Sequence, residues 1–116
     1  MRLNVGTASI GFIFRHVGET INLFAQMLGA PTDVTNTTMG QTDTGQHGDV
    51  IYSRELIERG YRTLEDMVEA SSDEDWLTPI ETPFFGTIPR IRLLAHALYH
   101  TSHHAGQISL TLARGK

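Results

Sequence analysis

The fold is indicated most clearly by one stretch of the sequence, Arg90-Ile-Arg-Leu-Leu-Ala-His96-Ala-Leu-Tyr-His100-Thr-Ser-His103-His104-Ala-Gly-Gln107-Ile-Ser-Leu-Thr-Leu-Ala113. Its apolar residues recur at steps of three and four, which is the period of a helix with one buried face. We expect this helix to begin near Thr87 or Ile88, with Pro89 in its first turn, and to end near Ala113. The expected buried stripe consists of Leu94, Ala97, Leu98, Thr101, Ala105, Ile108 and Leu112.

Four of the six histidines lie within this helix. The steps from His96 to His100 and from His100 to His104 are each four residues, and residues four apart stand on one face of a helix. His100 and His104 can therefore direct two imidazole nitrogens at one point, which is half of a metal site. His103 points about 100° away from His104 and is expected at the surface or behind a ligand. For His96 we favour packing, with a fourth ring in the pocket as the alternative.

The rest of the chain predicts further helices and no strands. One helix is expected over about 9–28, capped by Thr7 or Ser9 and ended by Gly29 and Pro31, and a second over 53–70, capped by Ser53. Residues 30–50 are predicted as a long loop with almost nothing to bury, 72–76 as a short helical turn, and 78–89 as an irregular connector. The prediction is a single all-α domain over 1–116, built as an antiparallel helical bundle.

The third metal ligand has to come from another helix, and His16 is the candidate because it borders the apolar stripe of the first helix. Three imidazoles with an open position would make a catalytic site. A fourth protein ligand, from His96 or Glu19, would instead make a structural one. A helical scaffold that packs its histidines without metal is the third alternative, and His47 is expected to be a simple loop residue.

Other polar side chains near these histidines are assigned supporting roles. Gln107, one turn after His103 and His104, is expected to orient an imidazole through its second nitrogen. Glu19, one turn after His16, could orient a ring, ligate the metal or serve as the catalytic base, and a solvated carboxylate is the plain alternative. Tyr52 and Tyr99 could orient a substrate, although tyrosines are more often structural.

Composition narrows the function classes. The chain has 116 residues and no cysteine, so any metal must be held by imidazole, carboxylate or water, which suits zinc, nickel, iron, manganese or cobalt. The formal charge is −4 and no Lys/Arg cluster occurs, which argues against nucleic acid as a partner. There is no membrane-length apolar run and no secretory signal, so we expect a cytoplasmic protein.

Two segments resemble the DinB-like metalloenzyme superfamily, also called the YfiT-like metal-dependent hydrolases. His100-Thr-Ser-His103-His104-Ala-Gly106-Gln107-Ile108 is similar to the ending of that family's last helix, and Ser9-Ile10-Gly11-Phe-Ile-Phe-Arg-His16 to its earlier ligand helix. The resemblance covers roughly residues 7–29 and 90–115. The family's ligands map onto His16, His100 and His104.

The resemblance implies a four-helix bundle with a divalent metal, usually zinc or nickel, in a three-histidine site; iron and manganese are further options. It implies a metal-dependent enzyme acting on a small molecule, either a hydrolase or a thiol-dependent S-transferase that uses a low-molecular-weight thiol. A non-catalytic module with a structural metal is the alternative.

The family usually has a full helix before its first ligand helix, whereas about eight residues precede it here. An apolar side of that length is rarely left open in a soluble monomer. We therefore expect a homodimer, or a swapped arrangement, that supplies the cover. Folding back of the 30–50 loop is the competing explanation.

Overall fold

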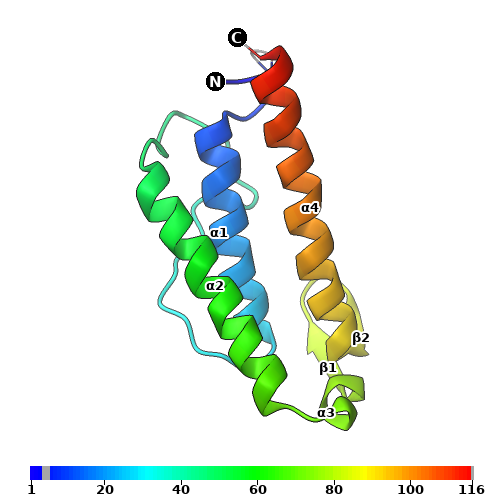
Figure 1. The fold of residues 1–116 in the computed structure, drawn as a ribbon. Coiled ribbons are helices and arrows are strands. Elements are labelled where there is room, and N and C mark those ends of the chain that lie inside the picture. The colour runs from blue at the N-terminus through cyan, green and yellow to red at the C-terminus, as the bar shows by residue number, and fades with distance from the viewer. Residues whose placement is uncertain (4–5, 116) are drawn as a thin grey trace.

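The structure is a computed structural model that describes residues 1–3 and 6–115. Three long helices stand side by side, and a short helix and a hairpin lie at one end (Figure 1). In chain order the elements are α1 (Ile10–Met27), α2 (Val50–Ala70), α3 (Asp73–Leu77), β1 (Pro79–Thr82), β2 (Gly86–Pro89) and α4 (Arg90–Arg114). The predicted helical class is confirmed.

Capping side chains set the beginnings of the helices. Ser9 accepts a hydrogen bond from Phe12 N and begins α1, as predicted. Helix α2 begins three residues before the predicted position, because Asp49 rather than Ser53 is its N-cap and accepts from Tyr52 N. Ser53 is buried inside the helix, where its hydroxyl accepts from Arg15 Nε at 2.9 Å. The predicted pairing of Ser72 and Asp75 is present as a capping box at α3.

The connector over residues 78–89 is not irregular, so the expectation of a chain without strands was wrong here. Strands β1 and β2 pair antiparallel, with Ile80 opposite Ile88 and Thr82 opposite Gly86. Gly86 has a φ of +66°, a conformation that favours glycine at the turn. Four-residue strands are too short to show a period, so the sequence pattern missed them. Pro89 ends β2 and is the N-cap of α4, which begins at Arg90.

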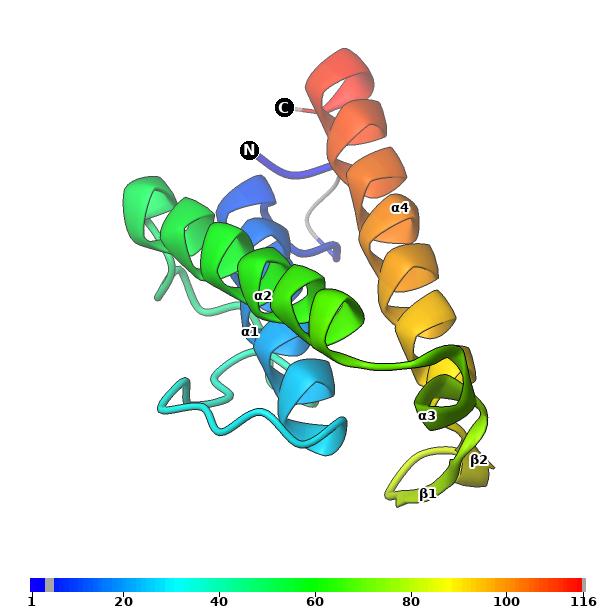
Figure 2. The same cartoon turned by 60° about the horizontal axis from the view of Figure 1, so that its bottom comes forward.

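Helix α4 runs antiparallel to α1, whereas α1 and α2 run parallel (Figures 1 and 2). The parallel direction follows from contacts that advance together along both helices: Gly18 meets Leu56, and Ile21 meets Gly60. The antiparallel arrangement expected for the whole bundle therefore holds for α4 relative to α1 and α2, but not for α1 relative to α2. Residues 28–49 form a long return connection that carries the chain back to the beginning of α1, and this return makes the parallel pair.

Glycine lets α1 and α2 approach closely. A Cβ added to Gly18 would lie 2.8 Å from Leu56 Cβ, and one added to Gly60 would lie 2.9 Å from Ile21 Cβ. Both distances are closer than real Cβ contacts, so side chains at these positions would push the helices apart. Gly60 weakens α2 as a helix former, but it fits α2 against α1.

The core lies on the inner side of α1. The apolar stripe predicted along α1 is Ile10, Ile13, Val17, Ile21, Phe24 and Leu28; the last five are buried and Ile10 is half-buried.

Helix α4 differs from expectation. It buries Leu93, Ala97 and Thr111, whereas Leu98 and Leu112 of the predicted stripe are 51% and 63% exposed. These two leucines stay exposed because α4 packs against α1, α3 and β2, and no further helix of the described chain covers its outer side.

The return loop packs against α1 and does not cover the outer side of α4. Ser9 N donates to Asp43 Oδ2 at 2.8 Å, and the side chains of Thr37 and Thr38 bond to Glu19 in α1. Thr38 is the one buried residue of the loop predicted over 30–50, so the expectation that this loop has almost nothing to bury holds. Within the described residues, no helix is both long and apolar enough to cross a membrane.

Candidate metal centre

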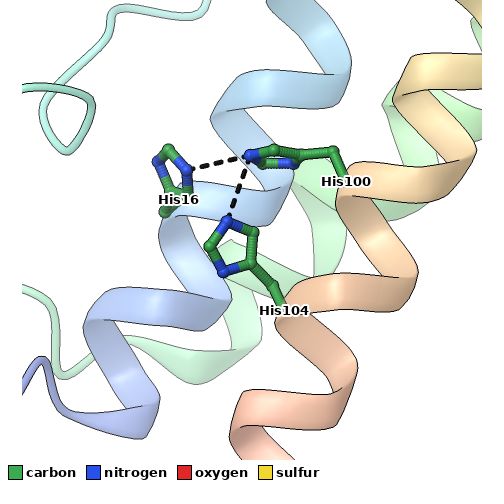
Figure 3. Close-up of side chains that lie close together, drawn as sticks. All are labelled: His16, His100 and His104. Carbon is green, nitrogen blue, oxygen red and sulfur yellow. Dashed lines mark hydrogen bonds between the residues drawn. The ribbon is translucent and has the colours of Figure 1, made fainter.

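The crossing of α1 and α4 brings three imidazole rings together (Figure 3). His16 lies in the second turn of α1, and His100 and His104 lie one turn apart on α4. The Nε2 atom of His100 is 3.1 Å from Nε2 of His16 and 3.1 Å from Nε2 of His104. One nitrogen from each ring lies within 4.8 Å of the others. The three residues singled out in the sequence therefore meet at one point.

The second nitrogen of His16 is held by a buried polar chain. Its Nδ1 lies 3.1 Å from Thr38 Oγ1, and the Thr38 hydroxyl donates to Glu19 Oε1 at 2.8 Å. Because that hydroxyl donates its hydrogen to the carboxylate, the Thr38 oxygen accepts a hydrogen bond from Nδ1–H of His16. The proton on Nδ1 leaves the Nε2 lone pair of His16 free and directed at the other two rings.

Glu19 is not the solvated carboxylate of the plain alternative, because it is 5% exposed. Its Oε1 accepts from Thr37 N at 2.7 Å and from Thr38 Oγ1, and its Oε2 accepts from Thr37 Oγ1 at 2.6 Å. The carboxylate thus faces the loop and reaches His16 through Thr38. This geometry favours the orienting role among those considered for Glu19.

Gln107 holds the second nitrogen of His104, as its position one turn later predicts. The Gln107 Oε1 atom is in hydrogen-bond contact with His104 Nδ1. An amide oxygen only accepts, so Nδ1 of His104 carries the proton and its Nε2 lone pair is also free. Two of the three rings therefore have their tautomers set by partners that leave Nε2 available.

His100 is held by packing. Its Nδ1 is buried and has no hydrogen-bond partner among the described residues. The Phe24 ring lies edge-on to it at 6.0 Å between centroids, and the rings of His16 and His104 lie at 4.9 Å and 4.4 Å. The neighbouring rings thus restrict the orientation of His100.

Burial keeps these imidazoles neutral. Desolvation, followed by repulsion from His104, lowers the pKa of His16 to about 4, against a smaller opposing effect of Glu19. Desolvation, followed by repulsion from His104 and His16, lowers the pKa of His100 to about 3. Desolvation also lowers the pKa of His104. Neutral imidazole is the form that binds metal, so the rings are ready ligands at neutral pH.

The donor set and its spacing fit a divalent ion. Zinc bound to imidazole nitrogen at about 2.0–2.1 Å holds tetrahedral ligand atoms about 3.3 Å apart, close to the 3.1 Å separations here. Without a cation, a proton on His100 Nε2 can form a hydrogen bond to only one of the two Nε2 atoms that face it, those of His16 and His104. A shared cation would satisfy all three lone pairs at once.

The remaining candidate residues lie outside this cluster. The His96 ring packs between Phe24 and Phe85, with centroids 5.6 and 4.6 Å away, which agrees with the packing role. His103 is exposed, as expected, and stacks on Tyr99. His47 lies in the return loop, as expected, and its Nε2 is 2.9 Å from Thr37 Oγ1.

The two tyrosines lie away from the point where the nitrogens of the three histidines converge. Tyr52 lies under the guanidinium of Arg15, at 4.6 Å, and Tyr99 is 64% exposed. Neither lines the cavity beside the histidines. Sequence reasoning missed Thr38, which sits in a Thr-rich loop where no residue spacing ties it to His16.

The depressed pKa values predict a pH dependence of stability for the metal-free protein. An unfolded chain takes up protons near the ordinary histidine pKa of about 6.5, whereas folded His16 and His100 take them up only near 4 and 3. Between these limits the unfolded state binds more protons, so the free energy of unfolding falls as the pH falls. We expect thermal melts in chelator to show a falling Tm from pH 7 to 4.5.

A His100→Gln variant should show a shallower decline, whereas Gln26→Ala, at an exposed and uncharged position of α1, should keep the original slope. Equal slopes in the wild type and His100→Gln would contradict this account.

Comparison with known proteins agrees with the geometry. No curated protein and no solved structure matches the chain. The family model described as the DinB superfamily matches residues 2–108, a range that contains α1, the return loop and all three histidines. The chain belongs to the DinB superfamily.

Proposed function

We propose that this protein is a divalent-metal-dependent enzyme that uses His16, His100 and His104 as ligands and keeps a coordination position open for substrate. Zinc or nickel is proposed first, since imidazole suits both, with iron and manganese as further options. The observation that carries the proposal is the convergence of three Nε2 atoms beside a cavity of about 390 Å³, which His16 and His104 line. The proposed setting is the cytoplasm.

The proposed reactions are hydrolysis and thiol-dependent S-transfer on a small-molecule substrate. A bound divalent ion supplies Lewis acidity that lowers the pKa of a coordinated water or thiol towards neutrality. The chain itself supplies the rest. His16, His100 and His104 fix the position of the ion, Thr38 and Gln107 orient two of the rings, and the cavity receives the substrate.

A non-catalytic module with a structural metal is the second candidate, and the surroundings of the histidines argue against it. A closed structural site needs a fourth protein ligand. Among the described residues, the cluster of potential ligands contains only the three histidines. His96 is packed between two phenylalanines, and Glu19 is bonded to two threonines. No described side chain therefore completes a closed site, and the cavity that His16 and His104 line can admit a further ligand.

The ligand assignment predicts the metal content of single variants. His100→Ala and His104→Ala should each lose most bound zinc or nickel, because each removes one of three ligands, while far-ultraviolet circular dichroism stays helical. His103→Ala is the matched control, being an exposed histidine on the same helix. The measurement is elemental analysis of protein prepared without a histidine tag. Unchanged metal in both ligand variants would show the assignment to be wrong.

Thr38 is predicted to position His16. Thr38→Val removes the bond to His16 Nδ1 and should weaken metal binding by roughly 10-fold or more, as is usual for groups that orient ligands. Thr37→Val is the control, because Thr37 bonds to the same carboxylate without contacting His16. Competition with a chromophoric chelator measures both affinities. Equal affinities for the two variants would contradict a positioning role.

A second copy of the chain is proposed to cover the outer side of α4. The exposed positions on that side follow a heptad spacing and are apolar or small: Ile91, Ala95, Leu98, Ser102, Ala105, Ser109 and Leu112. Residues 90–114 carry three arginines and no acid, whereas residues 50–70, which form α2, carry five acids and three arginines. Apposing α4 of one copy with α2 of the other would match these charges.

Light scattering should therefore give about twice the 12.9 kDa chain mass. Leu98→Glu should dissociate the dimer, because it places a charge in the apposed stripe. Leu77→Glu, at a similarly exposed leucine outside this stripe, should leave the dimer intact. A wild-type monomer would refute the arrangement.

A further inference from the structure

The cavity beside the histidines is lined mainly by apolar side chains. It lies among the N-terminal segment, α1, the return loop and α4, and its volume is about 390 Å³, a size typical of small-molecule sites. Thr38 and Gln107, which hold ring nitrogens of His16 and His104, belong to its polar lining together with these two histidines, Thr7 and Thr111. The apolar lining consists of Leu3, Ala8, Phe12, Ile13, Met39 and Leu110.

No described lining residue carries a full charge. The charged side chains of Arg2 and Glu19, which lie near the cavity, are bonded to other groups of the protein. Arg2, in the adjoining hollow, pairs with Asp43 at 3.2 Å and donates to Thr7 O at 2.9 Å. The Glu19 carboxylate lies behind Thr38, where three hydrogen bonds satisfy it. A ligand carboxylate placed against this lining, away from the ion proposed at the three histidines, would therefore lose water without gaining a cation.

From this lining we infer that the cavity takes a small, uncharged molecule with an apolar body and rejects ligands that carry a carboxylate within the cavity. Burying an ionised group without a partner is far more costly than burying a hydroxyl or a methyl group. The inference deepens the proposed function, because it supplies the substrate class for the same site. A single head group would face His16 and His104, and the apolar body would lie against Phe12, Met39 and Leu110.

The first experiment uses the metal-free protein, so that it does not depend on metal binding. Nuclear magnetic resonance titrations would compare 3-methylbutan-1-ol with 3-methylbutanoate, which share one carbon skeleton and differ in charge. We expect the alcohol to bind at least 10-fold more tightly, with shifts at the resonances of Met39 and Leu110. Equal affinity, tighter binding of the acid, binding of neither, or shifts confined to other residues would overturn the inference.

The second experiment moves a positive charge into the lining. Leu110 lines the cavity and is 49% exposed, so Leu110→Lys should fold and supply the missing cation. We expect its affinity for 3-methylbutanoate to rise at least 10-fold. Leu77→Lys, at an exposed position on α3 outside the proposed dimer stripe, is the control and should leave the affinity unchanged. No gain in a folded Leu110→Lys, or an equal gain in both variants, would count against the cavity as the binding place.

A third experiment compares a neutral thiol with an acidic thiol in the presence of zinc, and it separates failure of the metal proposal from failure of the cavity inference. A zinc-loaded protein should prefer 3-methylbutane-1-thiol over 3-mercaptopropionate by at least 10-fold. If the metal-free preference is found but zinc does not bind, the metal proposal fails and the cavity inference stands. If zinc binds and the two metal-free ligands are not distinguished, the cavity inference fails and the metal proposal stands.

Discussion

The antiparallel crossing of α1 and α4 is the contact on which the candidate metal centre depends. His16 comes from one helix and the His100–His104 pair from the other, so no local segment can build the cluster alone. The crossing is held by core residues on one side of the histidines, including Phe24, Leu93 and Ala97. The rings themselves occupy half-buried positions at the edge of this core, where burial disfavours their charged forms.

The return loop orients one of the histidine rings at the crossing of α1 and α4. Helices α1 and α2 run parallel, so a long segment must travel back along α1, and on the way it places Thr37 and Thr38 over Glu19. A buried carboxylate with three donors is stable without a cation, and it in turn fixes the Thr38 hydroxyl that sets the tautomer of His16. The loop thereby both orients a ring and forms one wall of the cavity.

The sequence predicted the parts of this arrangement that follow from helical periodicity. The pair His100 and His104, the α1 stripe and the role of Gln107 rest on steps of three or four residues, which one helix determines by itself. The parallel direction of α2 and the contact of Thr38 with His16 depend on the path of a long loop, and no periodic signal encodes such a path. The hairpin was missed because its strands are four residues long. The buried face of α4 was predicted correctly only in part, because periodicity does not tell which apolar residues will find a partner.

The central claim is that three imidazole nitrogens converge to hold one cation. X-ray absorption fine structure of the zinc- or nickel-loaded protein tests this most directly, because multiple scattering identifies imidazole ligands and their number. We expect three imidazole ligands, with zinc–nitrogen distances of about 2.0–2.1 Å. We also expect at least one further oxygen or nitrogen ligand, which added thiol replaces by a sulfur ligand. A first shell without imidazole scattering, or with one imidazole only, would contradict it.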